Sequence, residues 1–226
     1  FFLYLYYRMI ATIEPNTRKF TPQEYFKVLE RVNIKIELVN GLLQPKEANA
    51  PLPDWVVERV LEDDFKLEQL DFEFPMATTA HGRIIKNIAF GLNARLDEAK
   101  FDIFPQDPKV FISLSGRYRI PDVTVAPNIE AQIYQDDCLT NPTVIVEVLS
   151  EANRGTDFFL KLSDYKSIES LQEYWLIGQE ERAAERFLRQ DERNWSSFMF
   201  RESDERIYFP SLEAYLSFEE IYKGVE

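Results

Sequence analysis

The sequence predicts a single α/β domain with a mixed sheet, preceded by a short N-terminal arm. The chain has 226 residues and is 45% hydrophobic, which is enough apolar material for a sizeable core. No repeat or long Gly/Ser linker divides it. Its apolar pattern switches between helical and strand spacing in the coarse order helix, three strands, helix, strand. We therefore expect an arm over residues 1–19 and one domain over residues 20–226.

The first elements are predicted from a capping pattern and a turn pattern. Thr21-Pro-Gln-Glu24 resembles a capping box with Pro at the first helical position, and it opens a helix to about Arg31. Residues 34–44 are typical of a hairpin that turns at Asn40-Gly41. Residues 45–75 are interrupted by prolines before a helical pattern, and they indicate no particular role.

The central elements follow from apolar periodicity. Ile85, Ile88 and Leu92 recur with helical spacing behind Thr78 or Thr79 as a cap, which predicts the main helix over residues 79–100. Later elements are expected as strands at 109–115, 119–125 and 143–149, a helix at 157–168, a strand at 173–178, two strands within 183–209 separated by RESDER, and a short closing helix. The run TVIVEVL at 143–149 is nearly continuous in Val, Ile and Leu, as in a central strand covered on both faces.

Charge and cysteine content limit the functional classes. The formal net charge of −13 opposes non-specific nucleic-acid binding, which requires clustered Lys and Arg. Basic residues do gather near Arg83, Arg117, Arg119 and Lys161, either as a local basic surface or as ordinary solvated charges. A single cysteine and no membrane-length apolar window favour a reduced, cytoplasmic setting without membrane association.

Glu147 is the most informative residue, because it is the one charge inside an apolar strand. Burial of a bare carboxylate costs several kcal/mol unless a cation or metal compensates it. Asp122 lies on another predicted strand, and neighbouring strands are about 4.8 Å apart, so the two carboxylates could share one divalent ion. Lys161, on the following helix, could orient the attacking water and stabilise charge on phosphoryl oxygens.

Each of these residues also has a structural explanation. Asp122 could be a common strand-end Asp after Pro, Glu147 a partner in a buried ion pair, and Lys161 a surface partner of Asp157. Together they favour a site at one end of a sheet. A P-loop, a Rossmann fingerprint, a zinc finger and a Ser-His-Asp triad all lack essential residues in this sequence.

The chain resembles the Uma2-like family of PD-(D/E)xK restriction endonuclease-like proteins, formerly a domain of unknown function and abundant in cyanobacteria. The resemblance covers nearly all of residues 20–224, and an ordered set of strings carries it: FTPQEYFKVLE, IELVNGLLQ, the lone His81 at a helix start, PDVTVAP, TVIVEVLS, DFFLKLSDYKSI, EYWLIG and FPSLEAYLSFEEIY. It implies an αβββαβ core, with the N-terminal helix and hairpin and a C-terminal β-hairpin as additions.

The resemblance also implies residue roles. Asp122 and Glu147 match the ligands of Mg²⁺, for which Mn²⁺ could substitute, and Lys161 matches the catalytic lysine. In the broader superfamily this lysine stands two places after the acidic residue, where this chain has Leu149. Glu37 falls on the family's Glu-Leu-x-x-Gly string and could add a carboxylate or face solvent. His81 could contact a phosphate, carry a proton or make a structural hydrogen bond.

The leading hypothesis is therefore a Mg²⁺-dependent endonuclease that acts on nucleic acid, with DNA favoured and a homodimer expected. A non-catalytic dimeric scaffold that retains the nuclease fold is the alternative, and its acidic surface and aromatic N-terminus would suit protein partners. A two-carboxylate glycoside hydrolase is a weaker third hypothesis, since such an enzyme would not need Lys161.

Overall fold

The computed structural model describes residues 18–225 except 49, 129–132, 135–137 and 150–156. Its chain forms two compact units, residues 1–75 and 76–226. The arm predicted over residues 1–19 lies almost wholly outside the described residues, and the single domain over 20–226 stays a prediction. No helix in the described part of the chain combines the length and apolar character that a membrane crossing requires.

The first unit confirms both local predictions. Its elements are α2 (Pro22–Leu29), β1 (Ile36–Val39), β2 (Leu42–Pro45), α3 (Asp54–Leu61) and the 3₁₀ turn η1 (Leu67–Gln69). The Thr21 side chain accepts from the Glu24 backbone N–H, and the Glu24 carboxylate accepts from the Thr21 backbone, which completes the capping box. Asn40 and Gly41 both have positive φ, at 53° and 76°, as a tight hairpin turn between β1 and β2 requires.

The second unit is built on a six-stranded sheet. Its helices are α4 (Thr79–Asn93), α5 (Asp157–Lys166) and α6 (Phe218–Ile221). The sheet contains β3 (Phe101–Pro105), β6 (Val123–Pro127), β9 (Val144–Leu149), β10 (Glu173–Gly178), β11 (Ala183–Arg189) and β12 (Trp195–Arg201), in the order β12-β11-β10-β9-β6-β3. Within this sheet β9 and β10, which the crossover helix α5 connects, pair in parallel, and the other pairs are antiparallel.

The predicted αβββαβ order is confirmed as α4, β3, β6, β9, α5, β10, but the expected first strand was wrong. The segment 109–115 forms only β4 (Val110–Ile112), which pairs with β5 (Arg117–Arg119) and β8 (Cys138–Leu139), and β8 pairs with β7 (Ile133–Tyr134). The first core strand is instead β3, at the sheet edge. Pro105 is tolerated there because an edge strand has a side that needs no ladder partner.

Other boundaries also differ from the prediction. The main helix ends at Asn93 rather than near residue 100. The turn between β11 and β12 lies at residues 190–194, where Asp191 accepts from the backbone of Arg193 and Asn194, and RESDER instead leads into β13 (Arg206–Phe209). β13 pairs with β14 (Ala214–Ser217) in a hairpin that was not expected, and the expected short closing helix follows it as α6.

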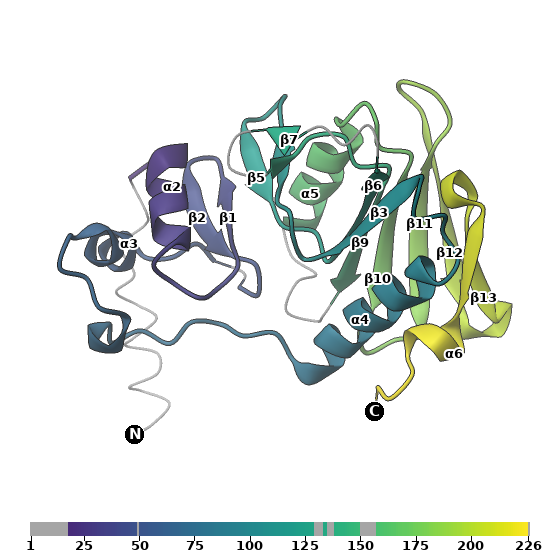
Figure 1. The fold of residues 1–226 in the computed structure, drawn as a ribbon, viewed down its shortest axis with the longest axis horizontal. Helices are drawn as coiled ribbons and strands as arrows, with labels where there is room; N and C mark the ends of the chain where they lie inside the picture. Colours follow the sequence, from purple (N-terminus) through teal and green to yellow (C-terminus); the bar gives the residue numbers. More distant parts are fainter. Residues whose placement is uncertain (1–17, 49, 129–132, 135–137, 150–156, 226) are drawn as a thin grey trace. The chain divides into compact units, whose positions relative to one another are not determined.

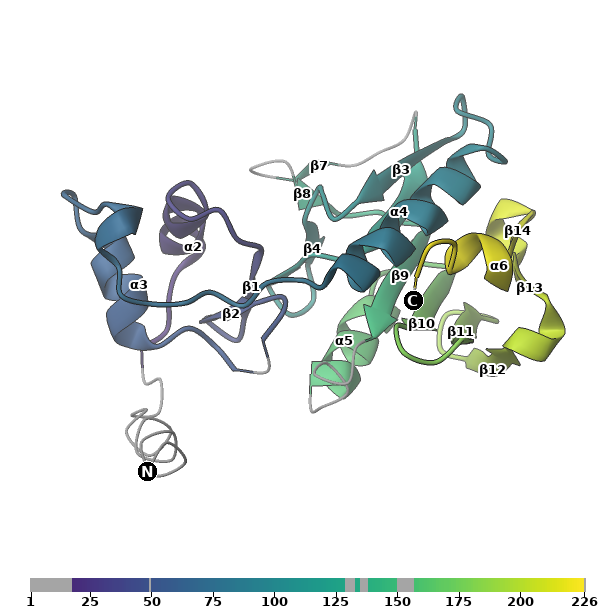
Figure 2. The same ribbon diagram turned by 90° about the horizontal axis from the view of Figure 1, so that it is seen from below.

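The two faces of the six-stranded sheet carry different layers. Figures 1 and 2 show α4 on one face and α5 on the other. Val144, Val146 and Val148 of β9 belong to the larger apolar cluster, with α4, β13, β14 and α6. Ile145, the alternate residue on β9, belongs to the cluster of α5. Because successive strand residues point to opposite faces, Glu147 points to the α5 face.

Candidate functional site

Glu147 is held on β9 beneath α5. Its side chain is buried, and Oε1 accepts from the Tyr165 hydroxyl at 2.7 Å and from Lys161 Nζ at 3.3 Å. Both donors come from α5, one helical turn apart, so the same face of the helix supplies them. The lysine of the following helix therefore reaches the strand carboxylate, as expected, whereas Leu149 occupies the position that carries it in the broader superfamily.

Asp122 lies immediately before β6, which pairs antiparallel with β9 in the register Val123↔Val146. One further step in this register places Asp122 opposite Glu147. The Asp122 side chain joins the ladder itself, because Oδ2 accepts from the Val148 backbone N–H at 2.7 Å. The two acidic residues are therefore neighbours as the sequence predicted, but the strand expected over 119–125 begins only at Val123, so Asp122 lies just outside it.

Two further side chains converge on Asp122. His81 is buried in the first turn of α4, behind the predicted Thr78 cap, with Nε2 3.1 Å from Asp122 Oδ1. Gln106 Nε2 lies 3.4 Å from the same oxygen, and the Gln106 backbone N–H donates to the Asp122 carbonyl. Both carboxylate oxygens of Asp122 are thus oriented by the protein, which fixes the side chain toward β9.

The helix that carries Lys161 is tied to β5 by a buried ionic cluster. Asp164 of α5 accepts from Arg117 Nη1 at 2.6 Å and from Arg119 Nε at 2.9 Å. Arg119 is fully buried, and the Asp164 side chain is 2% exposed. These arginines therefore belong neither to a basic surface nor to ordinary solvated charges, and both sequence readings of them were wrong. Their role here is to fix α5 against the strand.

The remaining predicted residue, Glu37, lies on β1 of the first unit, where its side chain is buried. Its reading as a hairpin glutamate facing solvent is therefore wrong. Asp157, the suggested surface partner of Lys161, has its side chain outside the described residues. Lys161 itself is only 13% exposed and contacts Glu147.

The donor atoms of the site fit a hard divalent cation in part. Within the portions of the chain that the structure describes, no group of three or more His, Cys, Asp or Glu side chains is arranged to hold a metal ion. Two carboxylates at neighbouring positions of adjacent strands nevertheless suit Mg²⁺, which retains several waters and commonly takes one or two protein carboxylates together with substrate phosphate oxygens. Asp122 and Glu147 could supply those two ligands.

Sequence reasoning missed two contributors to this site. Tyr165 was given no role, although its spacing of four from Lys161 on one helix indicates a shared partner. Nothing in the sequence pattern marks Gln106 as a site residue. Its position depends on its own left-handed backbone, at φ 59° just after β3, and on the hydrogen bond from its backbone N–H to the Asp122 carbonyl. The backbone N–H of Val148 is likewise visible only once β6 and β9 are in register.

Comparisons with known proteins agree with this arrangement. The Uma2 family model, described as "Putative restriction endonuclease", matches residues 63–218, which include Asp122, Glu147, Lys161 and His81 but exclude Glu37. An uncharacterized protein of Synechocystis sp. (strain ATCC 27184 / PCC 6803 / Kazusa), sll1609, is 33% identical over 122 residues, covering 53% of this chain and 68% of that protein.

A solved structure shares the fold. The crystal structure of "a putative nuclease belonging to DUF820" from Anabaena variabilis ATCC 29413 superposes with a TM-score of 0.58 at 15% identity, over 87% of this chain and 94% of that one. At this identity the likeness shows the fold alone, a mixed α/β architecture of the restriction endonuclease-like type. Because the family model matches most of this chain, the chain belongs to the Uma2 family of restriction endonuclease-like proteins.

Proposed function

We propose that this protein is a metal-dependent nuclease that hydrolyses phosphodiester bonds in nucleic acid, with DNA as the favoured substrate. Membership of the family supports nuclease activity in general. The observation that carries the residue assignment is the convergence of Lys161 on Glu147, which lies opposite Asp122 on the neighbouring strand. Burial of the Glu147 carboxylate costs free energy, which the Lys161 ammonium and the Tyr165 hydroxyl offset and a bound cation would offset further.

Asp122 and Glu147 are the proposed ligands of Mg²⁺, with Mn²⁺ as a substitute. When bound, such an ion lowers the pKa of a coordinated water and neutralises charge on the phosphoryl oxygens. The protein contributes the separation of the two carboxylates, which one strand spacing sets, and their orientation by fixed hydrogen bonds. Both side chains are buried, so bulk water competes weakly for their oxygens.

Lys161 is the proposed catalytic cation. Its ammonium lies beside the Glu147 carboxylate and is mostly shielded from solvent. At this place it can orient the attacking water and stabilise negative charge as the phosphorus–oxygen bond to the leaving sugar oxygen breaks. Tyr165 holds the carboxylate from the same helix, so water attack is directed by groups on a rigid element.

His81 is proposed to orient Asp122 rather than to contact the phosphate. Its ring is 2% exposed, and Nε2 faces the carboxylate. A buried imidazole with this partner fixes the direction of the acidic side chain, as second-layer groups do in metal sites. Glu37 remains a proposed accessory carboxylate.

We also propose that the nuclease acts as a homodimer in a reduced, cytoplasmic setting. β12 is an edge strand of the sheet, and its Phe198 and Met199 are 54% and 48% exposed. Exposed edges of this kind pair readily with a second chain. The chain's one cysteine, Cys138, is a buried free thiol, which is compatible with a reducing compartment. Sedimentation velocity of the wild-type protein measures the association state.

The decisive experiment compares the wild type with Glu147→Gln and Lys161→Met. Calorimetric titration with Mg²⁺ or Mn²⁺ measures ion binding, and plasmid, single-stranded DNA and RNA substrates measure cleavage. Glu173→Gln is the matched control, because Glu173 is a buried glutamate on the adjacent strand β10. We expect Glu147→Gln to lose ion binding, and both site variants to lose about 100-fold or more of the cleavage rate, while the control retains both.

Circular dichroism of all variants verifies that they are folded. A wild type that binds no divalent ion and cuts none of the substrates would refute the nuclease and leave the non-catalytic scaffold as the working model. Ion binding that survives in Glu147→Gln would refute the ligand assignment. Cleavage that survives in Lys161→Met at the wild-type rate would refute the role of the lysine.

A further inference from the structure

A pocket of about 370 Å³ adjoins the candidate site on the α5 face of the six-stranded sheet. Strand register relates the two. Leu176 of β10 pairs with Glu147, Glu185 of β11 pairs with Leu176, and Met199 of β12 pairs with Glu185. Residues paired across a sheet project from the same face. The paired residues Glu147, Leu176, Glu185 and Met199 therefore form one row across the sheet, which leads from the candidate site into the pocket.

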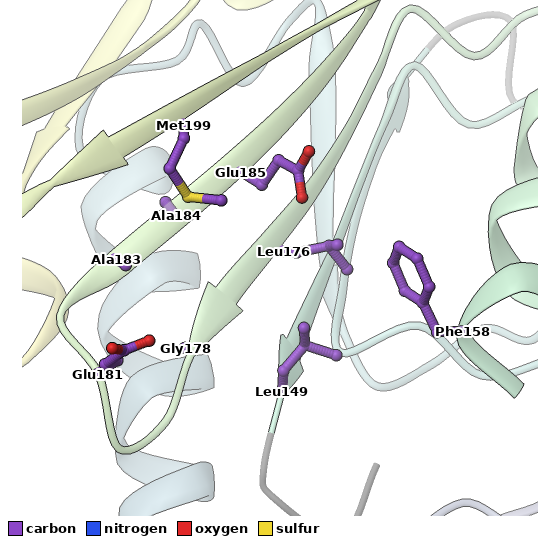
Figure 3. Close-up of a pocket in the computed structure, with 9 residues that line it drawn as sticks. All are labelled: Leu149, Phe158, Leu176, Gly178, Glu181, Ala183, Ala184, Glu185 and Met199. Atoms are coloured by element: carbon purple, nitrogen blue, oxygen red, sulfur yellow. The ribbon is translucent and has the colours of Figure 1, made fainter. Parts of the chain in front are cut away.

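The chemistry of the pocket differs from that of the metal site. Leu149, Phe158, Leu176 and Met199 supply apolar walls, and Glu185 supplies a carboxylate among them. Figure 3 shows Phe158 extending from α5 toward β10, and the Glu185 carboxylate extending from β11 toward the same strand. Glu181 also lines the pocket, beside Gly178 and Ala183. An aromatic ring and aliphatic side chains around the carboxylate acceptor of Glu185 suit a flat, mostly apolar ligand that bears N–H donors on its edge.

The separation between the pocket and the candidate site is comparable to the size of one nucleotide. Glu185 is two strands from Glu147, and strands are about 4.8 Å apart, so the backbones at these two residues are separated by about 10 Å across the sheet. That span is comparable to the length of one nucleotide from its phosphate to the outer edge of its base. A nucleotide with its phosphate near Lys161 can therefore extend its base over Leu176 to Glu185.

We propose that this pocket binds one unpaired nucleobase next to the scissile phosphate, and that Glu185 selects guanine. Guanine carries two adjacent N–H donors, at N1 and at the exocyclic amino group, which match the two oxygens of a carboxylate. Thymine and uracil present carbonyl oxygens beside a single N–H and are rejected by the same group. The base stacks on Phe158, as unpaired bases do on aromatic side chains in nucleic-acid-binding proteins.

The surroundings of Glu185 support a ligand that donates hydrogen bonds. Burial raises the pKa of its carboxyl, while the Lys166 ammonium opposes this effect. N–H groups from a base would stabilise the charged form that burial disfavours. A base within the pocket must be unpaired, so the substrate is single-stranded nucleic acid or a strand from which the base has been extruded.

The inference rests on the proposed nuclease function for the place of the phosphate, but its test does not require cleavage. Guanosine, cytidine, adenosine and thymidine, which carry no phosphate, are titrated into the metal-free protein, and binding is followed by protein-detected NMR. We expect guanosine to bind most tightly and thymidine most weakly. Glu185→Gln should weaken guanosine binding by about tenfold and strengthen thymidine binding, since a side-chain amide pairs with the donor and acceptor of thymine.

Matched variants separate recognition from folding. Phe158→Leu should weaken all four nucleosides through loss of stacking, whereas Glu180→Gln, which removes an equal charge just outside the pocket, should change none. A reversal of preference in Glu185→Gln cannot arise from misfolding. Equal affinity for the four nucleosides, or an unchanged preference in Glu185→Gln, would overturn the proposal.

Cleavage assays then distinguish this proposal from the nuclease assignment. Guanosine binding in a protein that cuts nothing would support the pocket and refute the nuclease. Cleavage of single-stranded oligonucleotides without any preference for a cut beside guanine, together with absent nucleoside binding, would refute the pocket and support the nuclease.

Discussion

Two buried glutamates on neighbouring parallel strands show how differently the two sheet faces are used. Glu147 of β9 points to the α5 face, where its partners are Lys161 and Tyr165. Glu173 of β10 accepts from Trp175 Nε1 and from the Ser211 backbone and hydroxyl, on the face closed by the larger apolar cluster. One glutamate has a cation within ion-pair distance, and the other has neutral donors as its hydrogen-bond partners.

The two faces of these strands therefore serve different purposes, because one face stabilises the fold and the other carries the candidate site. The face beneath α4, β13 and β14 contains the larger apolar cluster, and Glu173 helps to anchor the segment at Ser211 to it. The α5 face holds Glu147, Lys161 and the neighbouring pocket. Since strand residues alternate, a sheet can support both functions without sharing a side chain between them. Substitutions on the face beneath α4 should therefore leave the chemistry of the α5 face largely intact, and substitutions on the α5 face should leave stability largely intact.

The largest expected effect is on the closed face, from Trp175→Ala. Trp175 is fully buried and contacts Phe200 and Phe209, so its truncation leaves a cavity and removes the Glu173 hydrogen bond. We expect the free energy of unfolding to fall by about 3–5 kcal/mol in urea denaturation followed by circular dichroism. The cleavage rate per folded molecule should persist. A loss below about 1 kcal/mol would contradict the assignment of this face to stability.

An intermediate effect is expected on the α5 face from Tyr165→Phe. This change removes only the hydroxyl that donates to Glu147, and substitution of such second-layer groups typically costs 10- to 100-fold in metal affinity or activity. Mg²⁺ titration of the cleavage rate measures the effect. Tyr25→Phe, which removes a buried tyrosine hydrogen bond in the first unit, is the control for general destabilisation. Equal activities of the two variants would show that Tyr165 acts through stability alone.

The smallest expected effect concerns the pH dependence of stability at Glu173. Burial raises the pKa of this carboxyl above its usual 4.5, against the opposing hydrogen bonds from Ser211 and Trp175. The folded state therefore binds the proton more tightly than the unfolded state, and this contribution to stability is present below pH 4.5 and lost as pH rises through the raised value. Glu173→Gln should flatten that decline.

The measurement is the free energy of unfolding from urea titrations at a series of pH values for the wild type and Glu173→Gln. The difference between the two proteins isolates Glu173 from the other carboxylates. A difference that does not change with pH above 4.5 would contradict the raised pKa.

Local sequence signals predicted much of the secondary structure because they need only neighbouring residues. The capping box at Thr21, the hairpin at Asn40 and the helix cap at Thr78 were all recognised and are all present. The order of elements in the core was also predicted. The edge strand β3 was not, because FDIFP lacks clean alternation and ends in proline, so sheet partners rather than its own sequence decide its conformation.

By itself the sequence determined that Asp122, Glu147 and Lys161 stand out. A charge within an apolar run can be recognised from the sequence alone, because its burial requires a compensating partner wherever the strand lies in the fold. Tertiary structure alone decided that Arg117 and Arg119 pair with Asp164, and that Gln106 and His81 meet at Asp122. It also placed Glu185 in the same row of paired residues as Glu147, two strands away. Such neighbours are set by strand register and helix docking, which join residues far apart in the chain.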